Sequence, residues 1–292
     1  MGLLRAASIS AALLLISVSS AAQPEKLRIV ASFSLLADVI RNVTLDAADV
    51  STLIPLGADP HSFEPSARDL AALAEADLIF VAGAGFEESL LQTITAAASG
   101  VAIFEASTCV SMRPYGGLTE AVPHVDPGDR GHFDAANLDL DALCDGYDAY
   151  IADLDALKSG MGFPSAASAP TLSLGRLYEA DCSGGAEEVD DEHSHQTCDP
   201  HVWTSPRNVY YWTLYIRDVL TAVDPANADL YAAYEEEYLY AIDDLLRLEL
   251  EPLLDAVPPD RRVLLTNHET LGYFAESYGF DVLGFVLPGG SA

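Results

Sequence analysis

The chain has 292 residues, of which half are apolar, and this length suffices to bury a core in two domains. Asp and Glu number 45 against 14 Lys and Arg, so the formal net charge is -31 at pH 7. Such a charge repels nucleic acid and anionic membrane surfaces, and we therefore expect no nucleic-acid partner. It fits a protein that collects cations and one adapted to a salty habitat equally well.

The first residues have the pattern of an export signal. Arg5 precedes the apolar run AALLLISV at 11–18, and small residues follow it up to an expected cleavage point before Gln23. The run is shorter than the roughly 20 residues that a membrane span needs. No cysteine stands at the cleavage point. We therefore expect residues 1–22 to be a cleaved signal peptide and the mature protein to be periplasmic or secreted, without a lipid anchor.

Four cysteines become informative once export is expected, because disulfides are the default in an oxidising compartment. Three connectivities are possible. We favour Cys182 with Cys198 and Cys109 with Cys144, since the first pair closes a loop directly ahead of an Asp-Pro-His motif. A cysteine zinc site is a weak alternative, because the chain has no CxxC pair.

Apolar runs typical of strands alternate with helical patterns in the first half of the mature chain. Strands are expected at 26–33, 49–57, 77–83 and 100–107, and helices at 34–43 and 65–76. This alternation predicts an α/β fold with a parallel sheet, whose ligands bind at the carboxyl ends of its strands. Residues 108–198 form an insertion rich in Gly, Pro, Ser and Asp.

The second half begins with a helix at 205–223 and continues with a much longer one from Pro225 to about Leu254. One strand–helix–strand unit follows, which cannot enclose a core of its own, so the second lobe looks truncated. We expect an N-terminal α/β lobe with an acidic, Cys- and His-containing insertion, a long linking helix, and the incomplete start of a C-terminal α/β lobe. Their bounds are 23–223, 224–257 and 258–292.

Asp-Pro-His occurs twice, in GADPHSFEPS at 57–66 and in CDPHVWTSP at 198–206. Proline fixes its own φ and restricts the residue before it, so each histidine follows a stiff segment. A third histidine ends the strand expected at 261–268. Imidazole suits zinc, whereas manganese prefers more oxygen ligands, so His61, His201 and His268 favour zinc over manganese.

Three motifs, GADPHSFEPS, DPHVWTSP and TNHETLGYFAESYG, resemble in sequence and order the zinc- and manganese-binding solute-binding proteins of bacterial ABC metal importers. The resemblance implies two α/β lobes, with parallel sheets and flanking helices, joined by one long rigid helix, with the metal in the cleft between them. It implies His61, His201 and His268 as ligands of Zn2+, with Mn2+ possible. The family's fourth ligand, a late carboxylate, has no counterpart in this sequence.

The same resemblance implies that the protein delivers its metal to a membrane permease. The ATPase of the importer is then a separate chain, because this sequence lacks a GxxxxGK[ST] loop. We expect a monomer.

The acidic segment EEVDDEHSH looks like a short form of the loop that zinc-type members carry near the cleft. Weak zinc collection and a solvated loop without function fit it equally well. Its candidate ligands are Asp190, Asp191, Glu192, His193 and His195. For His124 and His132 we expect a surface loop.

Other functions stay open at this point. A manganese or iron receptor of the same class is one. A zinc-dependent hydrolase is another, because three histidines and an open fourth position suit a catalytic zinc, with Glu64 or Glu269 as the base. The chain has no helical HExxH, so we expect a protein that is not an enzyme. A surface adhesin rests on family analogy alone.

Overall fold

The structure is a computed structural model that describes residues 26–60, 62–114, 139–160, 175–178, 180, 182 and 198–286. The predictions of a signal peptide at 1–22 and of an auxiliary metal loop at 190–195 lie outside the described residues. The division into lobes at 23–223, 224–257 and 258–292 stays a prediction.

A four-stranded parallel sheet forms the centre of the first half, in the order β2-β1-β3-β4. Its strands are β1 (Leu27–Phe33), β2 (Ala48–Ile54), β3 (Leu78–Val81) and β4 (Ala102–Glu105). All four residues of β3 are buried, as expected for an inner strand with both faces covered. The parallel sheet predicted from the alternating pattern is thus confirmed.

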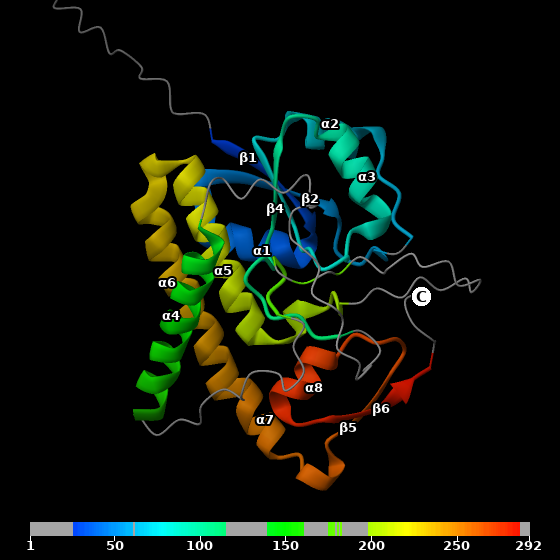
Figure 1. Ribbon diagram of the computed structural model, residues 1–292, viewed down its shortest axis with the longest axis vertical. Coiled ribbons are helices and arrows are strands. Elements are labelled where there is room, and N and C mark those ends of the chain that lie inside the picture. The colour runs from blue at the N-terminus through cyan, green and yellow to red at the C-terminus, as the bar shows by residue number, and fades with distance from the viewer. Residues whose placement is uncertain are drawn as a thin grey trace, which may run out of the picture.

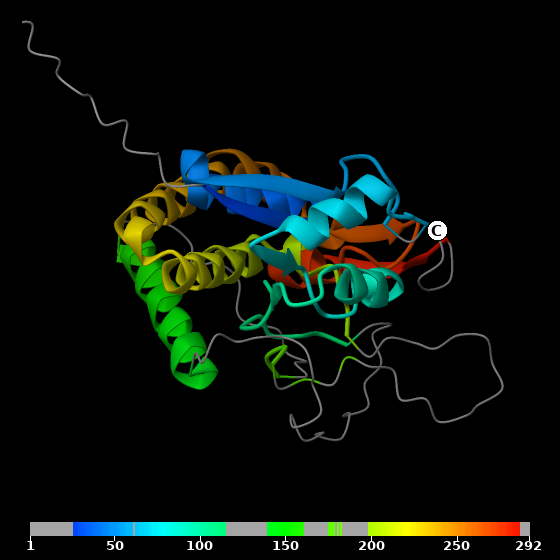
Figure 2. The same cartoon turned by 90° about the horizontal axis from the view of Figure 1, so that it is seen from above.

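Helices cover both faces of this sheet (Figures 1 and 2). They are α1 (Ser34–Thr44), α2 (Ala67–Glu75) and α3 (Glu88–Ala97). Strand β2 lies on one side of β1 in the sheet, and β3 and β4 lie on the other side. Because crossover connections are right-handed, α1 packs on one face of the sheet, and α2 and α3 pack on the opposite face. The strand order therefore reverses between β1 and β3, where α/β sheets bind their ligands at the carboxyl ends.

Four further helices follow in the described part of the chain, and they lead from beside the sheet toward the second half of the molecule (Figure 1). They are α4 (Leu140–Gly160), α5 (Pro206–Val223), α6 (Ala228–Leu245) and α7 (Glu251–Asp255). Helix α5 buries Trp212 and Tyr215 completely, or nearly so, and the Trp212 indole N–H donates to Ser107 Oγ at 2.9 Å. This hydrogen bond anchors the helix to the segment that follows β4.

The predicted long helix is present as a helical segment from Pro225 to Asp255, which includes α6 and α7. Between them lies a π-helical turn at Leu246–Leu250, closed by the Glu251 N–H donating to the Leu246 carbonyl. Pro252 has no N–H for the regular α pattern, so the wider π turn lets the helix continue across this position.

A second, two-stranded parallel sheet follows, with β5 (Val263–Thr266) paired to β6 (Asp281–Phe285). The connecting helix α8 (Gly272–Tyr278) ends at Gly279, whose φ of 66° is the left-handed conformation that glycine adopts readily at a helix end. Leu265 and Leu283 are 68% and 71% exposed, so this sheet is less covered than the first.

Two disulfides fix the segments on either side of α4. Cys109 joins Cys144 at a sequence separation of 35, and Cys182 joins Cys198 at a separation of 16. This is the connectivity that the sequence favours. The first bond ties the segment after β4 to α4, and the second ends one residue before Asp199.

The turn after β3 depends on a buried carboxylate. Gly83, Ala84 and Gly85 have φ values of 86°, 56° and 83°, so three successive residues adopt left-handed backbone geometry. The backbone N–H groups of Ala82 and Gly83 donate to the two oxygens of Glu87 at 2.7 and 3.1 Å. Glu87 is buried, and its burial raises the pKa of the carboxyl group.

We predict a pH-dependent contribution of Glu87 to stability. Because the folded-state pKa lies above the ordinary value of a glutamate, the native state binds more protons than the unfolded chain, so its free energy of unfolding falls as pH rises through the folded pKa. Glu87→Gln turns an N–H2 group toward a backbone donor and costs about 1–3 kcal/mol near pH 4.5. This difference from wild type should shrink at higher pH.

Urea unfolding of wild type and Glu87→Gln between pH 4.5 and 8 measures this difference. Glu88→Gln, at the exposed neighbour, is the control. A difference that stays constant over the whole range would contradict the prediction.

We also predict that the two disulfides contribute differently to stability. The chain-entropy relation gives roughly 4 kcal/mol for the 35-residue separation and roughly 3 kcal/mol for the 16-residue separation. Replacing each pair by serines and comparing thermal and urea unfolding should give the larger loss for Cys109 and Cys144. The opposite order would show that native packing, rather than loop length, decides the effect.

Candidate metal site

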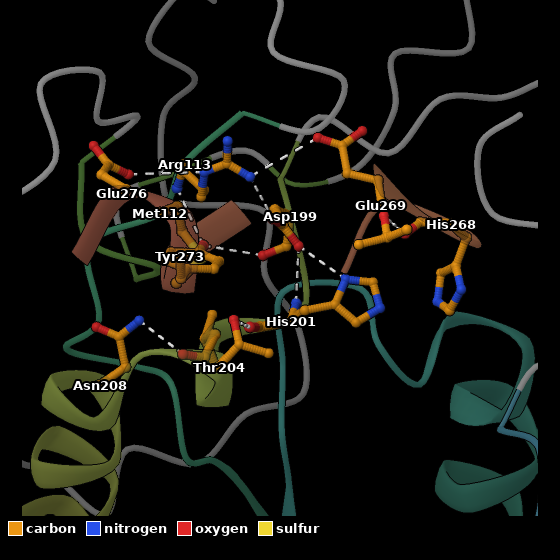
Figure 3. Close-up of polar contacts among 12 residues, drawn as sticks. Met112, Arg113, Asp199, His201, Thr204, Asn208, His268, Glu269, Tyr273 and Glu276 are labelled. Carbon is orange, nitrogen blue, oxygen red and sulfur yellow. Dashed lines mark hydrogen bonds and ion pairs between the residues drawn. The ribbon is translucent and has the colours of Figure 1, made fainter. Parts of the chain in front are cut away.

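His201 lies in a buried turn whose geometry is set by Asp199. The Asp199 side chain is fully buried, and its Oδ1 accepts from the His201 backbone N–H at 3.0 Å and lies 2.9 Å from His201 Nδ1 (Figure 3). A carboxylate only accepts hydrogen bonds, so Nδ1 carries the proton. The lone pair of Nε2 is then available to a metal, the arrangement in which a carboxylate orients a histidine ligand.

His268 lies in the turn after β5 and is held by its neighbours. Its backbone N–H donates to Asn267 Oδ1 at 2.9 Å, and its Nδ1 lies 3.2 Å from the same oxygen. Thr266 Oγ1 donates to the His268 carbonyl at 2.7 Å. This turn therefore also engages the Nδ1 side of the ring.

The structure brings these two histidines together although they are far apart in sequence. The ring centroids of His201 and His268 are 5.5 Å apart, with an interplanar angle of 63°. Two imidazoles that share a tetrahedral metal about 2.0–2.1 Å from each nitrogen have centroids roughly 5 Å apart. The spacing of the pair thus fits two ligands of one zinc-sized ion.

The third predicted ligand, His61, lies outside the described residues, although its loop is described on both sides. That loop follows the carboxyl end of β2, begins at Gly57 with φ of 85°, and has Ser62 Oγ donating to Asp59 Oδ2 at 2.7 Å. Among the residues that the structure describes, no group of three or more His, Cys, Asp or Glu is placed to hold a metal.

An aromatic cluster connects His201 to the carboxyl end of the first sheet. Trp203 lies edge-on to His201 with centroids 5.6 Å apart, and it contacts Phe33 at the end of β1 and Phe86 after β3, each at 4.9 Å. Such packing orients the imidazole and limits water on one side of it. The sequence signal for this cluster is the aromatic residue two positions after the second Asp-Pro-His, Trp203.

Arg113 is a residue of the site that the sequence does not indicate. Its Nη1 lies 2.6 Å from Asp199 Oδ2 and 3.8 Å from Glu269 Oε1, and its Nε lies 3.8 Å from Glu276 Oε2. The only signal is that cations are scarce in this acidic chain. The contact with Asp199 places a positive charge behind the carboxylate that holds His201.

Tyr273 of α8 is a second residue that sequence reasoning missed. Its hydroxyl accepts from the Arg113 backbone N–H at 3.1 Å and donates to the Asp199 carbonyl at 3.0 Å. Burial raises the pKa of this phenol, so it stays a neutral donor. The two hydrogen bonds join α8 to both segments of the site.

The carboxylates named for a hydrolase are not placed beside the histidine rings. Glu64 is exposed on its loop, and the Glu269 side chain turns toward Arg113 rather than toward the two imidazoles (Figure 3). A cavity of about 170 Å³ at the carboxyl ends of β5 and β6 is lined in part by Arg113 and Glu269. This geometry suits metal holding better than activation of water by either carboxylate.

Comparison with known proteins gives one matching family model and several curated relatives. The family described as "Zinc-uptake complex component A periplasmic" matches residues 29–291. The manganese-binding lipoprotein MntA of Halalkalibacterium halodurans is 27% identical over 89% of this chain and 60% of its own length. The iron ABC transporter substrate-binding lipoprotein MtsA of Streptococcus pyogenes serotype M1 is 24% identical over 88% of this chain and 61% of its own length. The chain thus spans about 60% of the length of these relatives.

Solved structures show the same fold. The Mn-bound periplasmic metal binding protein of Candidatus Liberibacter asiaticus has a TM-score of 0.55 and 22% identity, covering 89% of this chain and 68% of that one. A crystal structure of ZnuA has a TM-score of 0.57 and 20% identity, covering 89% and 71% of the two chains. The predicted α/β architecture with parallel sheets, flanking helices and a long helix is therefore confirmed.

The relatives overturn the prediction of localisation. MntA, MtsA and the PsaA of Streptococcus mitis are all named lipoproteins, so the expectation of a periplasmic or secreted protein without a lipid anchor is wrong. The expectation rested on one assumed cleavage point, whereas an apolar run followed by small residues directs export in either case. Within the described part of the chain, no helix is long and apolar enough to cross a membrane.

PsaA and MtsA are named as substrate-binding lipoproteins of ABC transporters and MntA as a manganese-binding lipoprotein, and none of these names is that of an enzyme, in line with the expectation of a protein that is not an enzyme. The spacing of His201 and His268, the fold and the family model all agree with a metal-binding transport protein. The family resemblance predicted from the three sequence motifs is confirmed, and the chain belongs to the family of the periplasmic zinc-uptake complex component A.

Proposed function

We propose that the protein is an extracytoplasmic solute-binding protein that captures zinc between its two halves and delivers it to an ABC importer. The observation that carries this proposal is the pair of imidazoles 5.5 Å apart, of which His201 comes from the first half and His268 from the second. His61, from the loop after β2, is the proposed third ligand. The importer's permease and ATPase would be separate chains, and the binding protein a monomer.

The ligand chemistry supports zinc. Nitrogen ligands from three imidazoles suit zinc, while manganese is usually held by more oxygen atoms. The second candidate function is a manganese or iron receptor of the same class, and the names of the manganese- and iron-binding relatives favour it. Both candidates share the transport role and differ in the metal.

We predict that the protein, stripped of metal, binds one zinc ion through the three histidines. Loss of a residue that only hydrogen-bonds a ligand lowers metal affinity by roughly 10- to 100-fold. Each of the variants His61→Ala, His201→Ala and His268→Ala removes a proposed direct ligand, so each should lower zinc affinity by at least that much. Isothermal titration calorimetry measures the affinities, with His132→Ala as the control.

Competition between zinc and manganese in the same assay separates the two candidates. Tighter zinc binding supports the proposal, and tighter manganese binding favours the second candidate. Unchanged zinc affinity in His201→Ala would exclude this histidine as a ligand and contradict the proposed site.

The acidic segment at 187–195 is proposed as an auxiliary collecting loop, from its Asp, Glu and His content alone. We predict that deleting it leaves the tight site intact and removes only weak zinc binding, because the proposed tight ligands lie elsewhere in the chain. Titration of the deletion variant with excess zinc should show fewer weak sites and one unchanged strong site. Loss of the strong site would show that the loop contributes to it.

A further inference from the structure

Arg113 reaches the metal site from a distant segment. It follows the disulfide-bonded Cys109 and lies next to Pro114, which forms an antiparallel bridge with Cys198. From there the guanidinium passes the beginning of α8 and contacts Asp199 at 2.6 Å, with the Arg113 side chain 17% exposed (Figure 3). The same group also lies 3.8 Å from Glu269, the neighbour of His268.

Gly272 makes this passage possible. A Cβ atom at this position would lie 1.5 Å from Arg113 Nη1, 2.3 Å from Arg113 Cζ and 2.8 Å from Asp199 Oδ2. Gly272 is not among the glycines with positive φ, so its backbone conformation is open to any residue. The need for glycine here therefore comes from the guanidinium beside it.

The electrostatics explain why the contact reaches His201. Asp199 is fully buried, and a buried carboxylate is costly unless it is paired and hydrogen-bonded. Arg113 Nη1 donates to Asp199 Oδ2, which leaves Oδ1 to accept from the His201 backbone N–H and from Nδ1–H of its ring. Without the guanidinium, Asp199 is free to turn toward other donors, and the imidazole loses the acceptor that fixes its tautomer.

We propose that Arg113 is a positioning residue that acts through Asp199 to hold His201 with Nε2 directed to the metal. Arg113 also couples the His201 ring to the His268 segment. Gly272, which has no side chain, leaves the space that the guanidinium occupies. The effect on metal affinity rests on the proposed function. The effect on the His201 tautomer does not, because it concerns the metal-free protein.

Three variants test the proposal. Arg113→Gln removes the charge, Arg113→Lys keeps it, and Gly272→Ala pushes the guanidinium away while leaving Arg113 in the sequence. The nearest atoms to that Cβ belong to the end of the flexible Arg113 side chain, which can move, so Gly272→Ala remains informative if Arg113→Gln fails to fold. Matched controls are Arg217→Gln, whose guanidinium pairs with Asp218 and Glu235 at 2.8 and 2.9 Å, and Gly146→Ala in α4, where a Cβ meets nothing within 4 Å.

The first measurement is the tautomer of His201 in metal-free protein, by long-range proton–nitrogen NMR with the signal assigned through His201→Gln. Wild type and both controls should show the Nδ1–H form, whereas Arg113→Gln and Gly272→Ala should show a mixture of tautomers. The second is zinc affinity, for which we expect a loss of about 10- to 100-fold in these two variants and partial recovery in Arg113→Lys.

The outcomes separate the two hypotheses. If wild type binds no zinc, the proposed function fails, and the tautomer still tests Arg113. An unchanged tautomer in both Arg113→Gln and Gly272→Ala overturns the positioning role, and so does an equal change in the controls, which would indicate general loosening. If the protein binds zinc and a variant changes the His201 tautomer but not the zinc affinity, Arg113 has no role in metal binding, which also contradicts the proposal.

Discussion

The buried carboxylate of Asp199 is the constraint on which the arrangement of the site depends. No part of its side chain is exposed, so each of its oxygens must be matched by donors from the protein. Arg113 supplies one oxygen with a charged donor, and His201 supplies the other with its backbone and ring N–H groups. The orientation of the imidazole is thus a consequence of satisfying Asp199, rather than a separate feature of the fold.

The first sheet contributes the other side of the site through apolar packing. Glu87 stabilises the left-handed turn after β3, and this turn places Phe86 against Trp203. Trp203 in turn packs against His201, while Phe33 closes the cluster from the end of β1. A polar contact with Asp199 and an aromatic contact with Trp203 therefore hold the same ring from two directions.

Local patterns in the sequence predict much of the fold because they reflect local physics. Apolar runs that alternate with helical patterns predicted the parallel strands, and the helix expected at 205–223 is α5. The Asp-Pro-His motif correctly indicated a stiff turn, but it did not reveal that the Asp199 side chain folds back onto His201. The helix expected from Pro225 to about Leu254 is present, but the sequence did not show that it passes Pro252 through a π-helical turn.

Contacts between distant segments could not be predicted in this way. Arg113 and Asp199 are 86 positions apart, and Arg113 and Tyr273 are 160 positions apart, so no periodicity links them. The role of Gly272 could not be predicted either, because it depends on the Arg113 side chain, which comes from another part of the chain. A glycine within a helical pattern is weak evidence until the neighbour that needs the space is known.

The scarcity of cations gives these long-range contacts a consequence for the whole molecule. With 14 Lys and Arg against 45 Asp and Glu, the net charge of -31 cannot be balanced on the surface. Arg113 and Arg217 are largely buried and are each paired with carboxylates in the interior, which leaves still fewer cations for the exterior. An acidic exterior raises the local concentration of divalent cations and is screened by salt, whereas the imidazoles of the proposed site would select a metal by ligand type. In the proposed function, the surface charge therefore serves encounter with the metal, and the geometry imposed through Asp199 serves its retention.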